Sequence, residues 1–368
     1  MKFLLISPKN RTVYNFRGDL IRAIRSLGYE VIVTGPDDTN VDRIEELGAK
    51  FIEIPMNKTG TSIAGDLNYC KALTELMKKE QPDVILGYTA KPVIYGAIAA
   101  KKAGIKNINC LITGAGYTFI AKSSKAKILG TIVKTLYRHA LAKADKVIFQ
   151  NPDDRNEFVS DGLVTADKTF VVNGSGVNME YFKQEPLPDG ITFFMLSRLL
   201  KSKGVREYLE AARIVKEKHP EVKFKLLGKY EYEMQDAIPQ AEIERYISGG
   251  IIERYEETDD VRSYYRDCSV YVLPSYREGT PRTVLEAMST GRAIITTDTN
   301  GCKGTVEDGV NGYLVPVQDA GAVAEAMEKF IENPEIIKQM GEKSIELCRD
   351  KFEVNKVNKK MLEIMNIE

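Results

Sequence analysis

The sequence contains no tryptophan, two histidines and five cysteines in 368 residues. The cysteines are odd in number and none belongs to a C-x-x-C pair, which excludes a disulfide framework and a cysteine-ligated zinc site. Scattered cysteines of this kind are typical of reduced thiols in a cytosolic protein. Two histidines are too few for a histidine-rich metal site, so we expect neither a metal nor a cofactor.

Long apolar runs are also missing from the sequence. No stretch approaches the ~20 residues that a membrane-spanning helix needs, and the apolar run at residues 1–8 is too short for a signal peptide. The composition, with 43% hydrophobic residues, is that of a soluble globular protein and excludes collagen, coiled coils and disorder. At roughly 100–200 residues per domain, the length predicts two domains.

The charge is balanced but unevenly distributed. Residues 1–184 contain 26 basic and 19 acidic residues, whereas residues 185–368 contain 26 and 33. Either the two halves face different partners, or the surface charge is scattered by chance. The acidic second half, which lacks interleaved aromatic and basic residues, argues against nucleic-acid binding.

Short β-branched or apolar runs alternate with amphipathic segments along the whole chain, which predicts βαβ units with helices on both faces of parallel sheets. In the first half the expected strands are Lys2–Ser7, Glu30–Gly35, Lys50–Pro55, Asp83–Tyr88, Asn107–Ile112, Lys146–Gln150 and Lys168–Asn173, and the expected helices are Gly18–Leu27, Leu67–Glu80, Pro92–Ala103 and Lys127–Lys143. In the second half the expected strands are Ile191–Ser197, Val222–Gly228, Ser269–Pro274 and Ala293–Thr297, and the expected helices are Val205–Lys218, Val261–Asp267, Thr283–Thr290 and Ala320–Glu332.

A segment rich in glycine, proline and charge, residues 174–190, separates the two series as an inter-domain linker would. We therefore expect an α/β fold with two Rossmann-like βαβ domains that face each other across a cleft lined by strand carboxyl ends. The predicted N-terminal domain is residues 1–183 and the predicted C-terminal domain is residues 184–350. Residues 351–368 are expected to form a helix that packs back on the N-terminal domain.

Two segments of the second half carry charged side chains at the ends of strands. In one of them Glu278 and Gly279 follow a strand, and the next helix is expected to begin at Pro281 with Thr280 as its N-cap. Free backbone N–H groups at the start of a helix form a site suited to a phosphate. Here these groups belong to Arg282, Thr283 and Val284.

The spacing of Glu278 and Glu286 lets them reach different parts of one ligand, where carboxylates accept hydrogen bonds from sugar hydroxyls. The alternative is that the first is a loop charge and the second a solvated helix residue. In the other segment, Arg198 and Lys203 follow the first strand of the second half. A planar guanidinium and an ammonium at this place can converge on one diphosphate, unless both are ordinary surface cations.

These two segments resemble the family 4 glycosyltransferases, which are retaining enzymes of the GT-B fold. The resemblance rests on the E-x7-E spacing of Glu278 and Glu286 and on Ser197–Gly204, which follows the pattern S/G-R-L-x-x-x-K-G. Supporting matches are Asn173–Asn178 with Phe182, Leu273–Ser275 and Glu307–Gly312. Within the family, the chain resembles bacterial hexosyl- and N-acetylhexosaminyltransferases of capsule and lipid-linked-oligosaccharide synthesis.

The resemblance implies a role for each matching residue. Arg198 and Lys203 would hold the diphosphate of a nucleotide-sugar donor, and with Glu278, which would contact the transferred sugar, they are the implied catalytic residues. Glu286 would bind the ribose hydroxyls. The other implied donor-binding residues are Gly279, Thr280, Pro281, Thr283 and Val284, with Gly228, Arg254 and Tyr255 around the base.

The first domain holds the acceptor-side candidates. Arg17 and Gly18 lie in an expected loop that approaches the donor phosphate or the acceptor, or else at an ordinary helix N-terminus. Gly114, Gly116 and Tyr117 lie in a loop where many family members carry a histidine. This chain has no histidine there, so no side-chain general base is identified.

The D-x-D metal motif of the other major glycosyltransferase fold is absent, because no two aspartates are two residues apart. The charge of the leaving group would then be neutralised by Arg198, Lys203 and helix N-termini, without a metal. The implied mechanism is front-side displacement with retention, in which the leaving diphosphate takes the acceptor's proton.

Residues 122–146 contain seven basic residues and one acidic residue. Among them, Lys127, Lys134 and Arg138 fall on one stripe of the expected helix. A basic amphipathic helix favours an anionic lipid surface or a diphosphate-lipid head group; the alternative is a core-packed helix with a solvated basic edge. We expect a cytoplasmic protein that docks peripherally on the inner leaflet and takes a polyprenyl-diphosphate-linked saccharide as acceptor.

The function expected from the resemblance is the retaining transfer of a hexose or N-acetylhexosamine from a nucleoside diphosphate sugar, with UDP favoured over GDP. A UDP-sugar 2-epimerase of the same fold and a non-catalytic saccharide-binding scaffold are the alternatives. A dinucleotide-dependent oxidoreductase would require a complete G-x-G-x-x-G, of which residues 114–116 supply only the first half.

Overall fold

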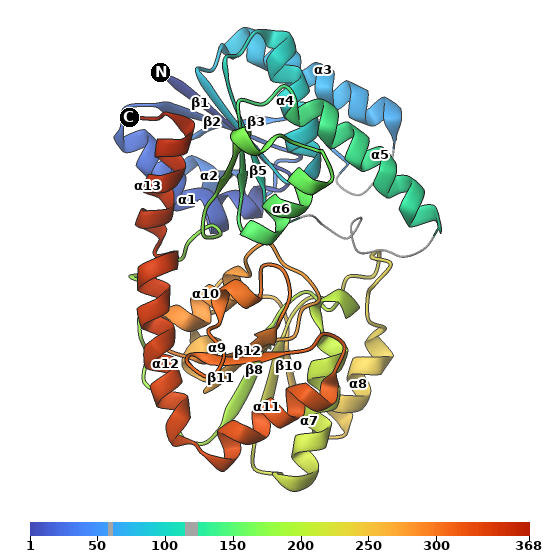
Figure 1. Ribbon diagram of the computed structural model, residues 1–368, viewed down its shortest axis with the longest axis vertical. Coiled ribbons are helices and arrows are strands. Elements are labelled where there is room, and N and C mark those ends of the chain that lie inside the picture. The colour runs from blue at the N-terminus through green and yellow to red at the C-terminus, as the bar shows by residue number, and fades with distance from the viewer. Residues whose placement is uncertain (58–61, 115–123) are drawn as a thin grey trace. The chain divides into compact units, whose positions relative to one another are not determined.

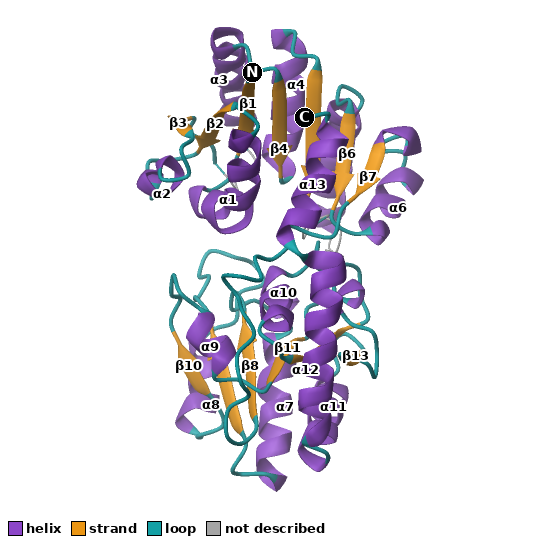
Figure 2. Cartoon of the chain, turned by 90° about the vertical axis from the view of Figure 1, so that its left-hand side faces the viewer, coloured by secondary structure: helices purple, strands orange, loops and turns teal. Residues whose placement is uncertain are grey.

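The computed structural model describes residues 1–57, 62–114 and 124–368, and for residues 124–128 it gives the backbone alone. The chain forms two compact units. The N-terminal unit consists of Met1–Ser175 together with Val354–Glu368, and the C-terminal unit is Gly176–Glu353. Each unit contains one parallel sheet with helices packed against it (Figure 1, Figure 2).

In the described part of the N-terminal unit, seven strands lie in the order β3-β2-β1-β4-β5-β6-β7. The strands are β1 (Lys2–Ile6), β2 (Glu30–Gly35), β3 (Lys50–Glu53), β4 (Val84–Tyr88), β5 (Asn107–Ile112), β6 (Lys146–Phe149) and β7 (Thr169–Val171). The helices are α1 (Asn10–Ser26), α2 (Val41–Glu45), α3 (Ile63–Glu80), α4 (Ala90–Ala103), α5 (Ser124–Leu141), α6 (Pro152–Ser160), a 3-10 turn (Ala166–Lys168) and α13 (Val354–Met365).

The C-terminal unit repeats this topology with six strands in the order β10-β9-β8-β11-β12-β13. The strands are β8 (Thr192–Leu196), β9 (Lys223–Leu227), β10 (Glu253–Tyr255), β11 (Val270–Leu273), β12 (Ala293–Thr297) and β13 (Gly312–Val315). The helices are α7 (Val205–Lys218), α8 (Gln240–Ser248), α9 (Arg262–Arg266), α10 (Arg282–Ser289), α11 (Ala320–Glu332) and α12 (Glu335–Leu347), with 3-10 turns Lys201–Lys203 and Lys303–Thr305 and a π-helical segment Cys348–Phe352.

In both sheets the strand order reverses in the middle, between β1 and β4 and between β8 and β11. Loops that leave neighbouring strands at such a point run to opposite sides of the sheet, and ligands of open α/β sheets bind in the crevice between them. The strands themselves are near-continuous apolar runs, as expected for strands covered on both faces. In β8, for example, Phe193, Phe194 and Met195 are all fully buried.

The C-terminal unit begins earlier than the predicted boundary after residue 183. The Val177 N–H donates a hydrogen bond to the Phe352 carbonyl at 2.8 Å, and the ring of Phe182 packs edge-on against Tyr265 at a centroid distance of 6.0 Å. These contacts tie the segment after Ser175 to the C-terminal unit rather than to the N-terminal one.

The last helix, α13, belongs to the N-terminal unit, although it is the end of the chain. Its residues Met361, Ile364 and Met365 are buried in the same core as β1 and α1. The Asn107 side-chain amide donates to the Met365 carbonyl at 2.7 Å. The C-terminal residues thus complete a core that residues 1–175 begin.

Substitution Met361→Ala tests this assignment. Removing a side chain that is 3% exposed leaves a cavity, and we expect a loss of about 2–4 kcal/mol in the free energy of unfolding. Urea unfolding followed by circular dichroism measures the loss. The matched control is Lys359→Ala on the exposed side of α13, and equal stability of the two variants would contradict the assignment.

Candidate active site

Two loops of the C-terminal unit meet at the reversal point between β8 and β11. They are Ser197–Gly204, which follows β8, and Pro274–Pro281, which follows β11. Gly204 has a φ of +73°, and a Cβ at this residue would lie 2.0 Å from the Pro274 carbonyl oxygen. Only glycine tolerates both this conformation and this contact, so the two loops pack backbone against backbone.

The packing brings together two of the predicted catalytic side chains. The Lys203 Nζ lies 2.5 Å from the Glu278 Oε1, and the two side chains are 20% and 15% exposed. The Ser275 hydroxyl donates to the same carboxylate oxygen at 2.8 Å. Lys203 and Glu278, which are 75 residues apart in the sequence, thus form an ion pair at the carboxyl end of the sheet.

Arg198, the other predicted diphosphate ligand, lies two residues beyond the end of β8. Its side chain is exposed, and within the described ranges it forms no hydrogen bond or ion pair with another residue. The guanidinium is therefore available to a ligand, whereas the ammonium of Lys203 already has a carboxylate partner.

The start of α10 differs by one residue from the prediction. The helix begins at Arg282, and Pro281 rather than Thr280 occupies the N-cap position, without a side-chain cap. The Val284 N–H donates to the Pro281 carbonyl at 3.1 Å, so this predicted phosphate donor is already used. The donors of the first turn that can reach a phosphate are the N–H groups of Arg282 and Thr283.

Glu286 is 8% exposed and lies inside α10. Its carboxylate accepts hydrogen bonds from the Tyr265 hydroxyl at 2.9 Å and from the Arg282 Nε at 3.2 Å. Burial raises the pKa of the Glu286 carboxyl, while Arg282 and the Tyr265 hydrogen bond act in the opposite direction. The alternative of a solvated helix residue is therefore wrong.

The predicted base-side residues lie at the ends of β9 and β10. A Cβ at Gly228 would lie 2.0 Å from the Ser197 carbonyl oxygen, so this glycine allows the loop after β9 to approach the loop after β8. The Arg254 guanidinium donates to the Gly228 carbonyl at 2.9 Å and lies 4.2 Å from the centre of the Tyr230 ring. Tyr230 carries no motif and was not predicted.

Tyr255 behaves differently from Arg254. Its hydroxyl donates to the Glu253 carboxylate at 2.6 Å, two residues back on the same face of β10. Partial burial together with Glu253 raises the pKa of Tyr255 to about 12. The hydroxyl thus points back along the strand, and only the aromatic ring is left to contact a ligand at the strand end.

The loop after β12 supports the backbone of Glu278. This contact was not predicted from the sequence. The Glu278 N–H donates to the Asn300 carbonyl at 3.1 Å. Gly301 has a φ of +78°, and a Cβ there would lie 2.2 Å from the Glu278 carbonyl oxygen and 2.4 Å from that of Gly279. A glycine after a strand was the only sequence signal, and such glycines are common in loops.

On the acceptor side, the expected loop around Arg17 and Gly18 is wrong, because both residues lie inside α1. Arg17 is 5% exposed, and its guanidinium lies 5.2 Å from the centre of the Tyr88 ring at the end of β4. The Tyr88 hydroxyl lies 2.7 Å from the hydroxyls of both Ser7 and Thr12. A buried polar group thus sits at the β1–β4 reversal point.

The remaining acceptor-side candidates are described only in part. Gly114 follows β5 with a φ of +129°, a conformation that favours glycine. Gly116 and Tyr117 lie outside the described residues, as does the side chain of Lys127.

The basic stripe of α5 is partly engaged within the N-terminal unit. The Lys134 Nζ lies 2.6 Å from the Asp161 carboxylate, and the Arg138 Nε donates to the Gly162 carbonyl at 2.9 Å. Apolar side chains of the same helix face solvent instead, since Leu129 is 37% and Ile132 52% exposed. In residues 129–141, the part of α5 whose side chains are described, exposed apolar side chains therefore stand beside basic side chains that bond within the unit.

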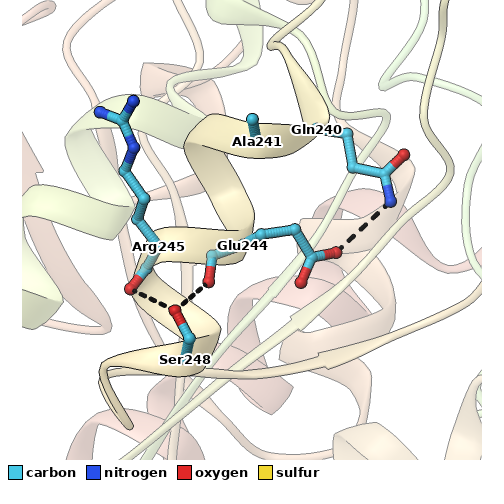
Figure 3. A pocket seen from close by; sticks show the side chains of 5 residues that line it. All are labelled: Gln240, Ala241, Glu244, Arg245 and Ser248. Carbon is cyan, nitrogen blue, oxygen red and sulfur yellow. Dashed lines mark hydrogen bonds between the residues drawn. The ribbon is translucent and has the colours of Figure 1, made fainter.

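A hollow of about 580 Å³ lies along α8 (Figure 3). Its lining residues bond within the helix and also accept hydrogen bonds from the Tyr232 and Tyr230 hydroxyls of the loop after β9. It is lined by Gln240, Ala241, Glu244, Arg245 and Ser248. None of these is a predicted site residue. The described ranges contain no group of three or more side chains suited to a metal ion, and none of their helices has the length and apolar content to cross a bilayer.

The brace by the loop after β12 predicts that Gly301→Ala is destabilising. The new Cβ would meet two carbonyl oxygens in a left-handed conformation, and we expect a loss of about 1–3 kcal/mol in the free energy of unfolding. Gly304→Ala, in the same loop, is the control, because its Cβ would meet nothing within 4 Å. Thermal unfolding compares the two, and equal melting temperatures would rule out the brace.

Solved structures with this fold include glycosyltransferases. HepE from Anabaena, solved with UDP and glucose, aligns over 100% of this chain and 99% of its own with a TM-score of 0.80 at 18% identity. Sucrose-phosphate synthase from Thermosynechococcus elongatus aligns over 100% of this chain and 98% of its own with a TM-score of 0.83 at 19% identity. At this identity the likeness establishes the fold.

One sequence relative is the N,N'-diacetylbacillosaminyl-diphospho-undecaprenol alpha-1,3-N-acetylgalactosaminyltransferase of Campylobacter jejuni, which is 26% identical over 91% of both chains. Another is the UDP-Gal:alpha-D-GlcNAc-diphosphoundecaprenol alpha-1,3-galactosyltransferase of Escherichia coli, which is 26% identical over 76% of this chain and 74% of the relative. The family model "Glycosyl transferase 4-like" matches residues 2–151, and "Glycosyl transferases group 1" matches residues 178–347. The chain therefore belongs to the glycosyltransferases of the GT-B fold, with a 4-like N-terminal half and a group 1 C-terminal half.

Proposed function

We propose that the chain transfers a hexose or an N-acetylhexosamine from a nucleoside diphosphate sugar, UDP first, to a saccharide linked to a polyprenyl diphosphate. The observation that carries the donor half is the Lys203–Glu278 pair at the β8–β11 reversal point, with the exposed Arg198 in the same loop as Lys203. The acceptor half is supported by the Campylobacter and Escherichia relatives, whose names specify saccharides on undecaprenyl diphosphate.

The donor site follows from the charges at the two loops. A diphosphate that enters between them accepts charge-assisted hydrogen bonds from the exposed Arg198 and from Lys203. Lys203 then exchanges a carboxylate partner for a phosphate, which leaves Glu278 able to accept a hydrogen bond from a hydroxyl of the transferred sugar. Glu286, held by Tyr265 and Arg282, has lone pairs left for the ribose hydroxyls.

The proposed reaction is a front-side displacement with retention. The bond between the sugar C1 and the β-phosphate oxygen breaks, and the acceptor oxygen bonds to C1 from the same face. The acceptor's hydroxyl proton passes to the leaving diphosphate, so the products are the lengthened saccharide and UDP. Arg198 and Lys203 stabilise the negative charge that grows on the leaving group, a role that a metal ion has in other sites, and we propose that the reaction requires none.

For the acceptor we propose peripheral docking of the N-terminal unit on the cytoplasmic leaflet. Support comes from α5, where Leu129 and Ile132 are exposed within a segment of seven basic residues and one acidic residue. Such binding has two components: apolar side chains enter the membrane interface, and nearby cations attract anionic lipid. Lys134 and Arg138, which also bond to the α6–β7 connection, would form the basic border of this docking surface.

Lys203→Ala tests the donor site. We expect UDP to stabilise the wild type in thermal-shift measurements, and we expect its dissociation constant, measured by calorimetry, to rise about 10- to 100-fold in the variant, because one charge-assisted hydrogen bond is lost. The control is Lys201→Ala, two residues earlier in the same 3-10 turn.

Glu278→Gln separates binding from transfer in the same experiment. It releases Lys203 from a charged partner, so we expect UDP to bind at least as tightly as in the wild type, while sugar transfer falls. Stabilisation of the wild type by NAD(H) alone, or unchanged UDP binding in Lys203→Ala, would remove the proposal.

The docking surface is tested with Leu129→Ser/Ile132→Ser. We expect binding to vesicles that contain phosphatidylglycerol to fall at least fivefold in a sedimentation assay, because less apolar area enters the interface. Val310→Ser removes a comparably exposed apolar side chain (44%) from the C-terminal unit and serves as the control. Equal vesicle binding by both variants would show that α5 is not the docking surface.

A further inference from the structure

Asp236, a 9% exposed residue in the loop after β9, bonds to both residues that precede Lys203. The Ser202 hydroxyl donates to its carboxylate. The Lys201 N–H donates to its backbone carbonyl at 2.8 Å. Two independent hydrogen bonds, one to a side chain and one to the backbone, thus join Asp236 to the 3-10 turn that carries Lys203.

The same turn is tied to the loop after β11 through one atom, the Ser202 carbonyl oxygen. It accepts a hydrogen bond from the Tyr276 N–H at 2.9 Å and lies 3.2 Å from the Ser275 hydroxyl oxygen. That hydroxyl also lies 2.8 Å from the Glu278 carboxylate, the partner of Lys203. Ser202, the residue before Lys203, therefore joins the loops after β8, β9 and β11.

A turn of this kind needs support from outside. It comprises only three residues, Lys201–Lys203, and its N-cap residue, Leu200, provides no side-chain cap. Short 3-10 turns have poor hydrogen-bond geometry and are not stable by themselves. Lysine is a point charge on a flexible four-carbon stem, so the direction of its ammonium depends on how firmly its backbone is held.

We propose that Asp236 is a positioning residue for the transfer reaction: through Ser202 it holds the Lys203 ammonium where the donor diphosphate binds. The inference rests on the proposed role of Lys203 as a diphosphate ligand. It extends the donor site to a carboxylate that touches no substrate. Asp236 lies in the same loop as Tyr230, whose ring packs against the Arg254 guanidinium. Its hydrogen bonds therefore connect the loop on the predicted base side to the loop on the diphosphate side.

The test measures UDP affinity by calorimetry on the full chain. We expect Asp236→Asn and Ser202→Ala each to raise the dissociation constant about five- to tenfold, and Ser202→Thr, which keeps the hydroxyl, to bind within twofold of the wild type. Because both act through Lys203, Asp236→Asn must add nothing in the Lys203→Ala background, as coupled sites are not additive.

A merely structural role gives a different pattern. It would lower the melting temperature of Asp236→Asn and leave its UDP affinity unchanged, or weaken binding equally with and without Lys203, and either result overturns the inference. Ser248→Ala, which removes a serine hydroxyl that bonds within α8, is the control. If Lys203→Ala itself binds UDP like the wild type, the proposed donor site fails; if only the Asp236 and Ser202 variants do, this inference alone fails.

Discussion

The site that we propose for the donor depends on one close contact, that of Gly204 with the Pro274 carbonyl oxygen. The sheet places the ends of β8 and β11 beside each other, and this backbone approach, together with the Tyr276 N–H bond to the Ser202 carbonyl, holds the two loops at a separation at which Lys203 can bond to Glu278. The charged side chains of the site are then anchored on short loops at strand ends. Preorganised charges of this kind stabilise a developing negative charge without rearrangement at the moment of reaction.

The fold and the charged residues of the site could be predicted because their signals are local. Apolar runs at regular intervals indicate the strands, and glycine and charge after a strand indicate a ligand-binding loop. The alternation of strands and helices predicts parallel sheets. It does not give the order of the strands, and hence it does not locate the reversal point. The boundaries were less accurate: α1 begins at Asn10 rather than Gly18, because the apolar period of Val13, Ile21 and Ile24 continues through a glycine that packs against Leu47.

The supporting residues could not be predicted, since each acts on a partner distant in the sequence and carries no motif. Nothing in the sequence marks Gly301, because its close approach to the Glu278 carbonyl exists only in the folded chain. The same is true of Asp236, whose hydrogen bond joins it to Ser202, 34 residues away in the sequence. Charge counting has the same limit. It finds the basic segment before residue 146, but only the structure shows that Lys134 of this segment pairs with Asp161 of the same unit.

The place of α13 has a consequence for the order in which the protein acquires structure. During synthesis domains generally fold as units, the N-terminal one first. Here residues 1–175 leave the ribosome long before Met361, Ile364 and Met365, which fill part of their core. The core that residues 1–175 begin is therefore completed only after the whole C-terminal unit has been made.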